Sequence, residues 1–440
     1  MREASSQRPR SIIVQKFGGT SVGSLERIEK SARIVLDKWK MGSAPVVVVS
    51  AMSGETNRLE SMAREIGHHE NAAMDLVLSA GEQVTVGLMS LMLDRLAREE
   101  GLIGASESIA EPALAHQLPI GTHSQEHADA VIDYVNNAKV YANADLGKIT
   151  VLPGYQAFNG EEVLTLGRGG SDTSAVSIAG LLHATLCEIY TDVDGVYSAD
   201  PRLCGDAIKY NLITTDEMQI LSRNGAKVMH HKAIDAAHAY KVPVVVKSSF
   251  EPLKQGTLIV HPSFVSEIDE SEKLEQSSYI YGLTAIKDVM VLEIPKKEGL
   301  EQELKEGLSM LSLTAQEDRL QVIFDSKYWN NLEEILSKQE ISINAPKTLY
   351  GKISILGENL DNSKEKIGET IEGILDGSSN EVKGVEKNGE VVSILVNRDS
   401  LSEIARKIHG SCLSLIGPKL KDFDPSVILD KLTKTKARHG

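Results

Sequence analysis

The sequence predicts an α/β protein with a mostly parallel central sheet in a three-layer arrangement, followed by two small α+β units. Up to residue 262, apolar runs typical of strands alternate with helical stretches, which indicates a parallel sheet with helices on both faces. Beyond that point the chain turns acidic and polar, and then changes to shorter strand and helix patterns. A length of 440 residues is also too great for one ordinary core and indicates two or three domains.

The first region contains the larger set of expected elements. Its strand-like runs are Ile12–Lys16, Pro45–Ser50, Ile149–Leu152, Cys187–Thr191 and Val242–Lys247. Apolar residues at helical spacing from Leu25 to Trp39 predict a helix that begins near Ser24. A second helical run extends from Ala175 to Leu182, and Ser171, Asp172 or Thr173 is expected to cap it.

The second region follows an acidic stretch, residues 263–278, which is typical of a linker. Its expected strands are Val289–Ile294, Leu320–Phe324, Lys352–Leu356 and Val391–Val396, with helices near Asn331–Lys338 and Leu401–His409. This rhythm fits two βαββαβ-like units. We therefore expect a domain at 1–262, a linker at 263–278, one unit at 279–345 and a second unit with the C-terminal tail at 346–440.

Composition limits the class of protein. The formal charge of −15, without a long basic block, argues against nucleic acid or an anionic membrane as the main partner. The three cysteines, Cys187, Cys204 and Cys412, form no CxxC pair, which predicts reduced thiols and no zinc site. The start lacks an apolar signal core, and we expect no stretch of membrane-spanning length. These features predict a cytoplasmic protein.

The stretch VQKFGGTSVGS, residues 14–24, places a lysine where a strand becomes a glycine turn that leads into a helix. Backbone N–H groups at such a junction attract anions, and Lys16 adds a full positive charge at the end of the strand, where open α/β sheets bind ligands. The stretch is not a Walker A loop, because the lysine precedes the glycines. Taken alone, it is also compatible with an ordinary turn that carries a solvated lysine.

The stretch LGRGGSDTSA, residues 166–175, is a second turn of this kind. Arg168 precedes the glycine pair, and its guanidinium group fits a carboxylate or a phosphate bidentately. Two anion-binding turns at one sheet are harder to explain as structural turns than one.

Two further stretches follow, YTDVDGVYSADPR (190–202) and NGAKVMHHKA (224–233). The first lacks the spacing and the final glutamate of a calcium loop, so a loop around a nucleotide is the better interpretation. Lys227 lies near an expected helix start. His230 and His231 are adjacent and cannot share a helix face as paired metal ligands do, so we interpret them as structural or surface residues and predict no metal site.

The sequence strongly resembles the aspartate kinases of the amino-acid kinase superfamily. The residues that carry the resemblance are KFGGTS (16–21), SGETN (53–57), SAGE (79–82), LGRGGSD (166–172), TDVDGVYSADPR (191–202) and GAKVMH (225–230). They occur in the family's order along about 250 residues. The region after the linker resembles, more weakly, the paired ACT regulatory units that end many single-function aspartate kinases. The resemblance implies an amino-acid kinase fold and phosphorylation of the L-aspartate β-carboxylate by Mg²⁺-bound ATP, on the route to lysine, threonine, methionine and diaminopimelate.

The resemblance also implies a role for each matching residue. Lys16 would contact the phosphates and stabilise the transition state, and Asp172 would orient catalytic lysines. On the substrate side, Arg168 would bind the α-carboxylate and Glu82 the α-ammonium group, with Thr56, Ser171 and Tyr155 beside them. Around the nucleotide would lie Gly18, Gly19, Ser21, Gly169 and Gly170, which would let backbone amides approach the phosphates, and Thr191, Asp192, Tyr197, Arg202, Lys227 and Val228.

Three alternatives remain at this point. Another amino-acid kinase, such as a glutamate or uridylate kinase, would share GRGGSD, although KFGGTS, SAGE and the long tail argue against it. A non-catalytic ligand sensor would keep the fold, but the charged residues of the site are all present. A bifunctional kinase–homoserine dehydrogenase would need a further dinucleotide-binding domain with its own GxGxxG.

The tail implies regulation. Paired ACT-like units can associate with those of a second chain, so we expect a homodimer with an amino-acid effector, for which lysine is the first choice. The segment VMVLEIPKKEGLEQELKEGLSMLSL (289–313) offers only a short helical stretch, and Pro295 and Gly299 interrupt it further. A unit kept for dimerisation alone is therefore the alternative.

Overall fold

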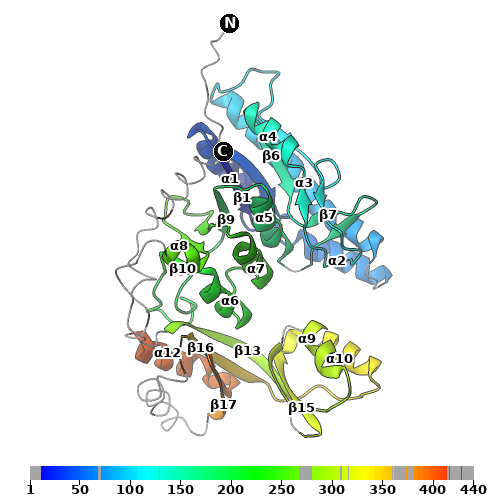
Figure 1. Cartoon of the computed structure of the whole chain (residues 1–440), viewed down its shortest axis with the longest axis vertical. Coiled ribbons are helices and arrows are strands. Elements are labelled where there is room, and N and C mark those ends of the chain that lie inside the picture. Colours follow the sequence, from blue (N-terminus) through cyan, green and yellow to red (C-terminus); the bar gives the residue numbers. More distant parts are fainter. Residues whose placement is uncertain are drawn as a thin grey trace.

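The computed structural model describes residues 11–67, 71–127, 129–167, 169–266, 280–307, 310–315, 317–358, 360, 373, 381–413, 416 and 428. Arg168 and most of the expected linker lie outside these residues. The described chain forms a mostly parallel sheet, a small second sheet and a C-terminal antiparallel sheet (Figure 1). The predicted fold class is confirmed.

The central sheet has eight strands and is parallel except where β11 meets β12. In spatial order they are β10 (Leu212–Thr214), β12 (Thr257–Val260), β11 (Val244–Ser248), β9 (Leu186–Thr191), β1 (Ile12–Phe17), β2 (Ala44–Val49), β6 (Ile149–Pro153) and β3 (Ala110–Pro112). All five predicted strands of this region are present. Strand β1 lies between β9 and β2, so its carboxyl end, with Lys16, is at the centre of the sheet.

Helices cover both faces of this sheet. Alternation along β2 sends Val46 and Val48 into a core shared with α4 (Asn137–Asp145), α5 (Gly170–Leu181) and α7 (His231–Tyr240). Val47 and Val49 point into an opposite core formed with α1 (Leu25–Lys40) and α3 (Ala72–Glu99). This gives the three layers. The predicted start of α1 is confirmed, because the Ser24 hydroxyl accepts from the Arg27 amide at 3.2 Å.

Helix α3 corrects one expectation. Its 28 residues are long and apolar enough, by length and composition alone, to cross a membrane, with a mean hydropathy of 1.5 over the relevant window. The prediction that no stretch reaches this length is therefore wrong. The protein buries 56% of that window. Its inward face also carries the carboxyl groups of Asp75 and Glu82, which are typical of a polar site in a core helix and unfavourable against lipid.

The sequence did not predict the small sheet, whose strands are only two or three residues long. In order they are β5 (Tyr134–Val135), β4 (Ile120–Gly121), β7 (Gln156–Phe158) and β8 (Val163–Thr165). Strands this short show no periodicity of their own, so tertiary contacts decide them. Helix α2 (Glu55–Ile66) lies at the same end of the molecule (Figure 1).

The C-terminal sheet has six antiparallel strands. In spatial order they are β14 (Met310–Ala315), β15 (Arg319–Asp325), β13 (Ile280–Pro295), β16 (Tyr350–Gly357), β18 (Val391–Asn397) and β17 (Val382–Asn388). The helices of this region are α9 (Leu300–Gly307), α10 (Trp329–Lys338) and α12 (Leu401–Cys412). Short 3₁₀ turns lie at Ser326–Tyr328 and Arg398–Ser400. The first half of β13 pairs with β16 and the second half with β15. The two expected units therefore share one continuous strand.

Strand β13 also contacts the first region. The Leu283 amide donates to the Ser198 carbonyl at 2.7 Å, and the Thr284 hydroxyl donates to the Asn224 carbonyl at 2.6 Å. Tyr281 is buried in the same core as β1 and α5. The C-terminal sheet is thus packed directly on the end of helix α6 (Thr215–Arg223).

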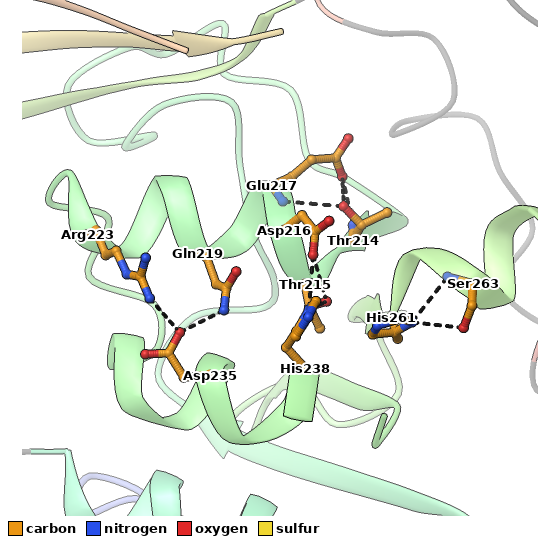
Figure 2. Close-up of polar contacts among 10 residues, drawn as sticks. All are labelled: Thr214, Thr215, Asp216, Glu217, Gln219, Arg223, Asp235, His238, His261 and Ser263. Carbon is orange, nitrogen blue, oxygen red and sulfur yellow. Dashed lines mark hydrogen bonds and ion pairs between the residues drawn. The ribbon is translucent and has the colours of Figure 1, made fainter. Parts of the chain in front are cut away.

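Polar contacts hold α6 against α7, as Figure 2 shows, and His261 caps the start of α8 (Pro262–Ser266) through contacts with Ser263. Asp235 of α7 accepts from Gln219 at 2.7 Å and from Arg223 at 2.9 Å. One turn further along α7, the His238 ring lies 4.7 Å from the ring of His261. Helix α6 is therefore fixed on one side by α7 while it supports β13 on the other.

Candidate active site

The first glycine turn holds Lys16 at the end of β1. The Gly18 amide donates to the Tyr190 carbonyl at 3.1 Å, which ties the turn to the end of β9. A Cβ on Gly18 would lie 3.4 Å from the Lys16 Nζ, so glycine leaves room for the ammonium group over the turn. Lys16 itself is only 7% exposed. A buried lysine needs a partner of opposite charge.

That partner is Asp172, whose Oδ1 lies 2.5 Å from Lys16 Nζ. The two residues are far apart in the sequence, and the pair joins the first glycine turn to the first turn of α5. The structure differs from the expected cap here. Helix α5 begins at Gly170, and its N-cap is Gly169 in a left-handed conformation with φ of 73° and no side-chain hydrogen bond. Ser171, Asp172 and Thr173 therefore lie inside the first turn of the helix, so none of them caps it, and the Asp172 carboxylate pairs with the ammonium group of Lys16.

Glu82 of α3 lies in the same cluster. The Ser171 hydroxyl donates to its Oε1 at 2.9 Å, and the Tyr155 amide donates to its Oε2 at 2.5 Å. Burial raises the pKa of Glu82 to about 8, although these hydrogen bonds and the charge of Lys16 oppose that rise. At neutral pH the Glu82 side chain is therefore mostly the uncharged carboxylic acid. A cation that binds beside it would favour the ionised carboxylate.

Tyr155 lies between Glu82 and the start of α5. A Cβ on Gly170 would lie 2.9 Å from a ring carbon of Tyr155, so the ring packs directly on the first residue of that helix. Burial raises the pKa of Tyr155 to about 12. The predicted residues Lys16, Glu82 and Tyr155 are thus joined through α5.

The predicted nucleotide side follows β9. Thr191 and Asp192 stand at the strand end, and their side chains are hydrogen-bonded at 3.1 Å. Further along the loop, the Tyr197 hydroxyl donates to Asp194 at 2.8 Å. Arg202, with its side chain 85% exposed, pairs with Asp200 at 2.9 Å.

Lys227 lies outside any helix, because α7 begins at His231. It is exposed. The pKa of Asp200 is lowered by its hydrogen bond with Arg202 and, to a smaller extent, by the positive charge of Lys227, so Lys227 lies on the same side as Arg202. Val228 is half-buried and packs against the core beneath.

The structure departs from the sequence prediction at three backbone amides. The amides of Gly18, Ser21 and Gly170 already donate to the carbonyls of Tyr190, Gly18 and Gly167. The Ser21 hydroxyl is also buried, 2.7 Å from Ser249 Oγ. These residues hold the turns and do not present free N–H groups. Gly19 approaches the backbone of Ala51, where a Cβ would lie 3.1 Å from the carbonyl oxygen.

Two predicted substrate residues are not brought into this cluster by described contacts. Thr56 is half-buried in the first turn of α2. Arg168 lies outside the described residues, between Gly167 and Gly169, which have φ of 71° and 73°.

The sequence analysis missed a polar group behind Tyr155. Asp75 is 1% exposed and accepts from Thr165, and it also contacts His127. One signal was available. Asp75, Ser79 and Glu82 recur at positions i, i+4 and i+7 of an otherwise apolar helix, which places a polar stripe on one face.

Residues 11–248 match the model of the amino acid kinase family. The aspartokinase of Pseudomonas aeruginosa is 33% identical over 418 residues, which cover 90% of this chain and 96% of that protein. The aspartokinase of Helicobacter pylori is 41% identical over 251 residues, 57% of this chain and 59% of that protein.

Among solved structures, Escherichia coli aspartokinase III in complex with aspartate and ADP aligns with a TM-score of 0.66 at 21% identity, over 91% of this chain and all of that one. Its complex with lysine and aspartate aligns with a TM-score of 0.65 at 21% identity, over 92% of this chain. At this identity the likeness shows the fold. The family match over more than half of the chain, together with the near full-length relative, establishes that the chain belongs to the amino acid kinase family and, within it, to the aspartokinases.

Proposed function

We propose that this chain is an aspartate kinase, which transfers the terminal phosphoryl group of Mg-ATP to the β-carboxylate of L-aspartate and releases 4-phospho-L-aspartate and ADP. The observation that carries the proposal is the ion pair of 2.5 Å between Lys16 and Asp172. It brings both glycine turns to one point at the carboxyl edge of the sheet, where α/β proteins bind their ligands. The near full-length aspartokinase relative supports the same reaction.

The chemistry of the acceptor explains the residues. A carboxylate with an ordinary pKa of about 4 is already ionised at neutral pH, so it needs no general base. The obstacle is electrostatic, since an anion must approach a polyanion and charge must be stabilised on the group in transfer. Lys16 supplies positive charge at this point, and Asp172 fixes its position.

The remaining residues divide into two sides. For the acceptor, Glu82 receives the α-ammonium group and Arg168 the α-carboxylate, while Thr56, Ser171 and Tyr155 help to place the substrate. For the nucleotide, Lys16 binds phosphate, the turns at Gly18, Gly19, Ser21, Gly169 and Gly170 shape the space around it, and Thr191, Asp192, Tyr197, Arg202, Lys227 and Val228 line the remainder. Mg²⁺ enters with ATP as part of the substrate.

The state of Glu82 gives a pH prediction. Before aspartate binds, the pKa of Glu82 is about 8, so below that pH the carboxyl group is mostly protonated. An ammonium group favours the carboxylate, so aspartate binding releases a proton, and the aspartate KM should fall as the pH rises toward 8, by up to about tenfold per pH unit. Initial rates between pH 6 and pH 9 measure this.

The matched control is Glu82→Gln, which cannot ionise and should give a high aspartate KM that hardly changes with pH. A wild-type KM that is flat between pH 6 and pH 8 would contradict this role for Glu82. The KM for ATP, measured on the same samples, reports any general effect of pH on the enzyme.

A substrate panel tests the function itself. ADP release is measured with ATP and aspartate, glutamate, UMP or carbamate as the acceptor. We expect release with aspartate only. Release with another acceptor favours a different amino-acid kinase, and release with none of them favours the ligand sensor.

We also propose that the enzyme is a cytoplasmic homodimer, with a kinase domain at 1–262, a linker at 263–278 and regulatory units at 279–345 and 346–440. The buried free thiols of Cys187, Cys204 and Cys412 agree with a reducing compartment. In the first unit, α9 has only eight residues, and Gly299 before it has φ of 79°, so the helical stretch of this unit is short, as the sequence indicates.

Lysine is the effector that we expect to act through these units. Calorimetry on the full chain should detect lysine binding, and lysine should inhibit the kinase with a coupling of about 1–3 kcal/mol. Threonine and methionine serve as matched ligands, and sedimentation gives the oligomeric state. If the dimer neither binds lysine nor responds to it, the C-terminal sheet serves in dimerisation alone.

A further inference from the structure

We infer that Asp75 and His127 position Tyr155 and, through it, the acceptor amino acid. The inference rests on the proposed function and adds two residues to its acceptor side. A chain of contacts carries it, from a half-buried histidine in a surface loop, through Asp75 and Thr165, to the strand that follows Tyr155. None of its links lies on the nucleotide side of the site.

The centre of this chain of contacts is Asp75, in the first turn of α3. The Thr165 hydroxyl donates to Asp75 Oδ1 at 2.5 Å, and His127 Nδ1 lies 2.7 Å from Asp75 Oδ2. Both oxygens of a carboxyl group that is 1% exposed are thereby satisfied. A buried carboxyl group without such partners would destabilise the fold, so the contacts fix the positions of all three residues.

The next link reaches the candidate site. Thr165 of β8 pairs with Gln156 of β7, the residue directly after Tyr155, and the Thr165 hydroxyl donates to Asp75. The backbone amide of Tyr155 donates to Glu82. Tyr155 is therefore held from two sides, because Glu82 accepts from its amide and Asp75 fixes the strand that pairs with the next residue. These two acidic residues lie on one face of α3, seven positions apart, so a single rigid helix sets both anchors.

His127 fixes the outer end of the chain. Its Nδ1 contacts Asp75, and its Nε2 lies 4.0 Å from Glu162. The histidine stands in the loop between β4 and β5, and its side chain is 24% exposed. The imidazole thus connects a loop at the surface to a carboxyl group in the core, and its removal would leave Asp75 without one of its two partners.

The consequence concerns acceptor binding. Because the Tyr155 ring packs on Gly170, next to Ser171 and Asp172, a change in its position alters the space beside the acceptor. Among the described hydrogen bonds, none joins Lys16 or the residues after β9 to His127, Asp75 or Thr165. Weakening this chain of contacts should therefore raise the KM for aspartate and leave kcat and the KM for ATP almost unchanged.

The test combines single and double variants of the full chain. Asp75→Asn keeps the shape of the side chain, and Thr165→Val removes only the hydroxyl that donates to Asp75. Each should raise the aspartate KM about tenfold, with kcat and the ATP KM within about twofold of wild type. The double variant should show no more than the larger single effect, because both changes break the same chain.

Three further variants complete the design. His127→Ala should reproduce the effect of Asp75→Asn, and His127→Gln, which restores a donor toward Asp75, should recover most of the wild-type KM. If Asp75→Asn fails to fold, this pair decides the question. His123→Gln is the matched control, because His123 forms a 3.0 Å pair with Asp133 in the same loop and should leave all constants unchanged.

The outcomes separate this inference from the proposed function. A wild-type enzyme that does not act on aspartate overturns the function. A wild-type enzyme that does act on aspartate, together with additive effects in the double variant or equal losses in kcat and both KM values, overturns the positioning role alone. An unchanged aspartate KM in Asp75→Asn and in His127→Ala overturns it as well.

Discussion

Lys16→Ala should fold, retain part of its ATP binding and lose at least about a hundredfold in kcat. Lys16 stands at the carboxyl end of the central strand, only 7% exposed, with its ammonium group over the Gly18 turn. From there the ammonium group would reach the oxygens that gain charge during transfer. The loss should therefore appear in the chemical step more than in the KM of either substrate, and steady-state kinetics with ATP and aspartate measure it.

Two variants control for indirect effects. Lys16→Arg keeps the charge but changes its shape and should recover part of the rate, because the pair with Asp172 can form again. Lys30→Ala removes an exposed lysine that pairs with Glu26 on α1 and should behave as wild type. A wild-type rate in Lys16→Ala would make KFGGTS a structural turn.

Arg168→Ala is expected to lower kcat/KM for aspartate by about 30- to 1000-fold, with near-normal ATP affinity. A charge-assisted bidentate contact to the substrate α-carboxylate contributes roughly 2–4 kcal/mol. The reason lies in the resemblance of LGRGGSD to the family motif and in the position of this residue directly before the turn that starts α5. The measurement is the pair of KM values, determined at saturation of the other substrate.

Arg202→Ala is the reciprocal control, because Arg202 lies on the proposed nucleotide side. It should raise the KM for ATP and spare that for aspartate. A loss of ATP binding in Arg168→Ala with an unchanged aspartate KM would move Arg168 to the nucleotide side.

Much of the fold was predictable, since each long strand carries its own signal. Strands β1, β2, β6 and β9 are buried on both faces and read as continuous apolar runs. The short strands of the second sheet carry no such signal, because pairing with each other and contact with α3 define them. Capping of α5 was also mispredicted. Local rules favour Ser171, Asp172 or Thr173 as the cap, but the helix already begins at Gly170, and the Asp172 carboxylate pairs with the distant ammonium group of Lys16.

The residues of the candidate site also differ in whether the sequence predicts them. Residues in family motifs could be named from the sequence, and Lys16 and Asp172 do meet. Asp75 and His127 belong to no motif, and 52 positions separate them. A lone aspartate near the start of an apolar helix is ordinarily a first-turn residue that faces water. Its burial follows from how α3 packs against β8, which the sequence pattern does not contain.

The shared strand β13 limits how this enzyme can change in evolution. Its first half contributes Tyr281 to the core of the kinase region, and its second half forms the first of the two C-terminal units. Deleting the tail would open the catalytic core, and adding or removing one residue within the strand would turn its inward side chains outward. A lineage can therefore change the helices and loops of the C-terminal units by substitution, but it has to keep the sheet. Such a unit is retained for the stability of the kinase region even where it binds no ligand.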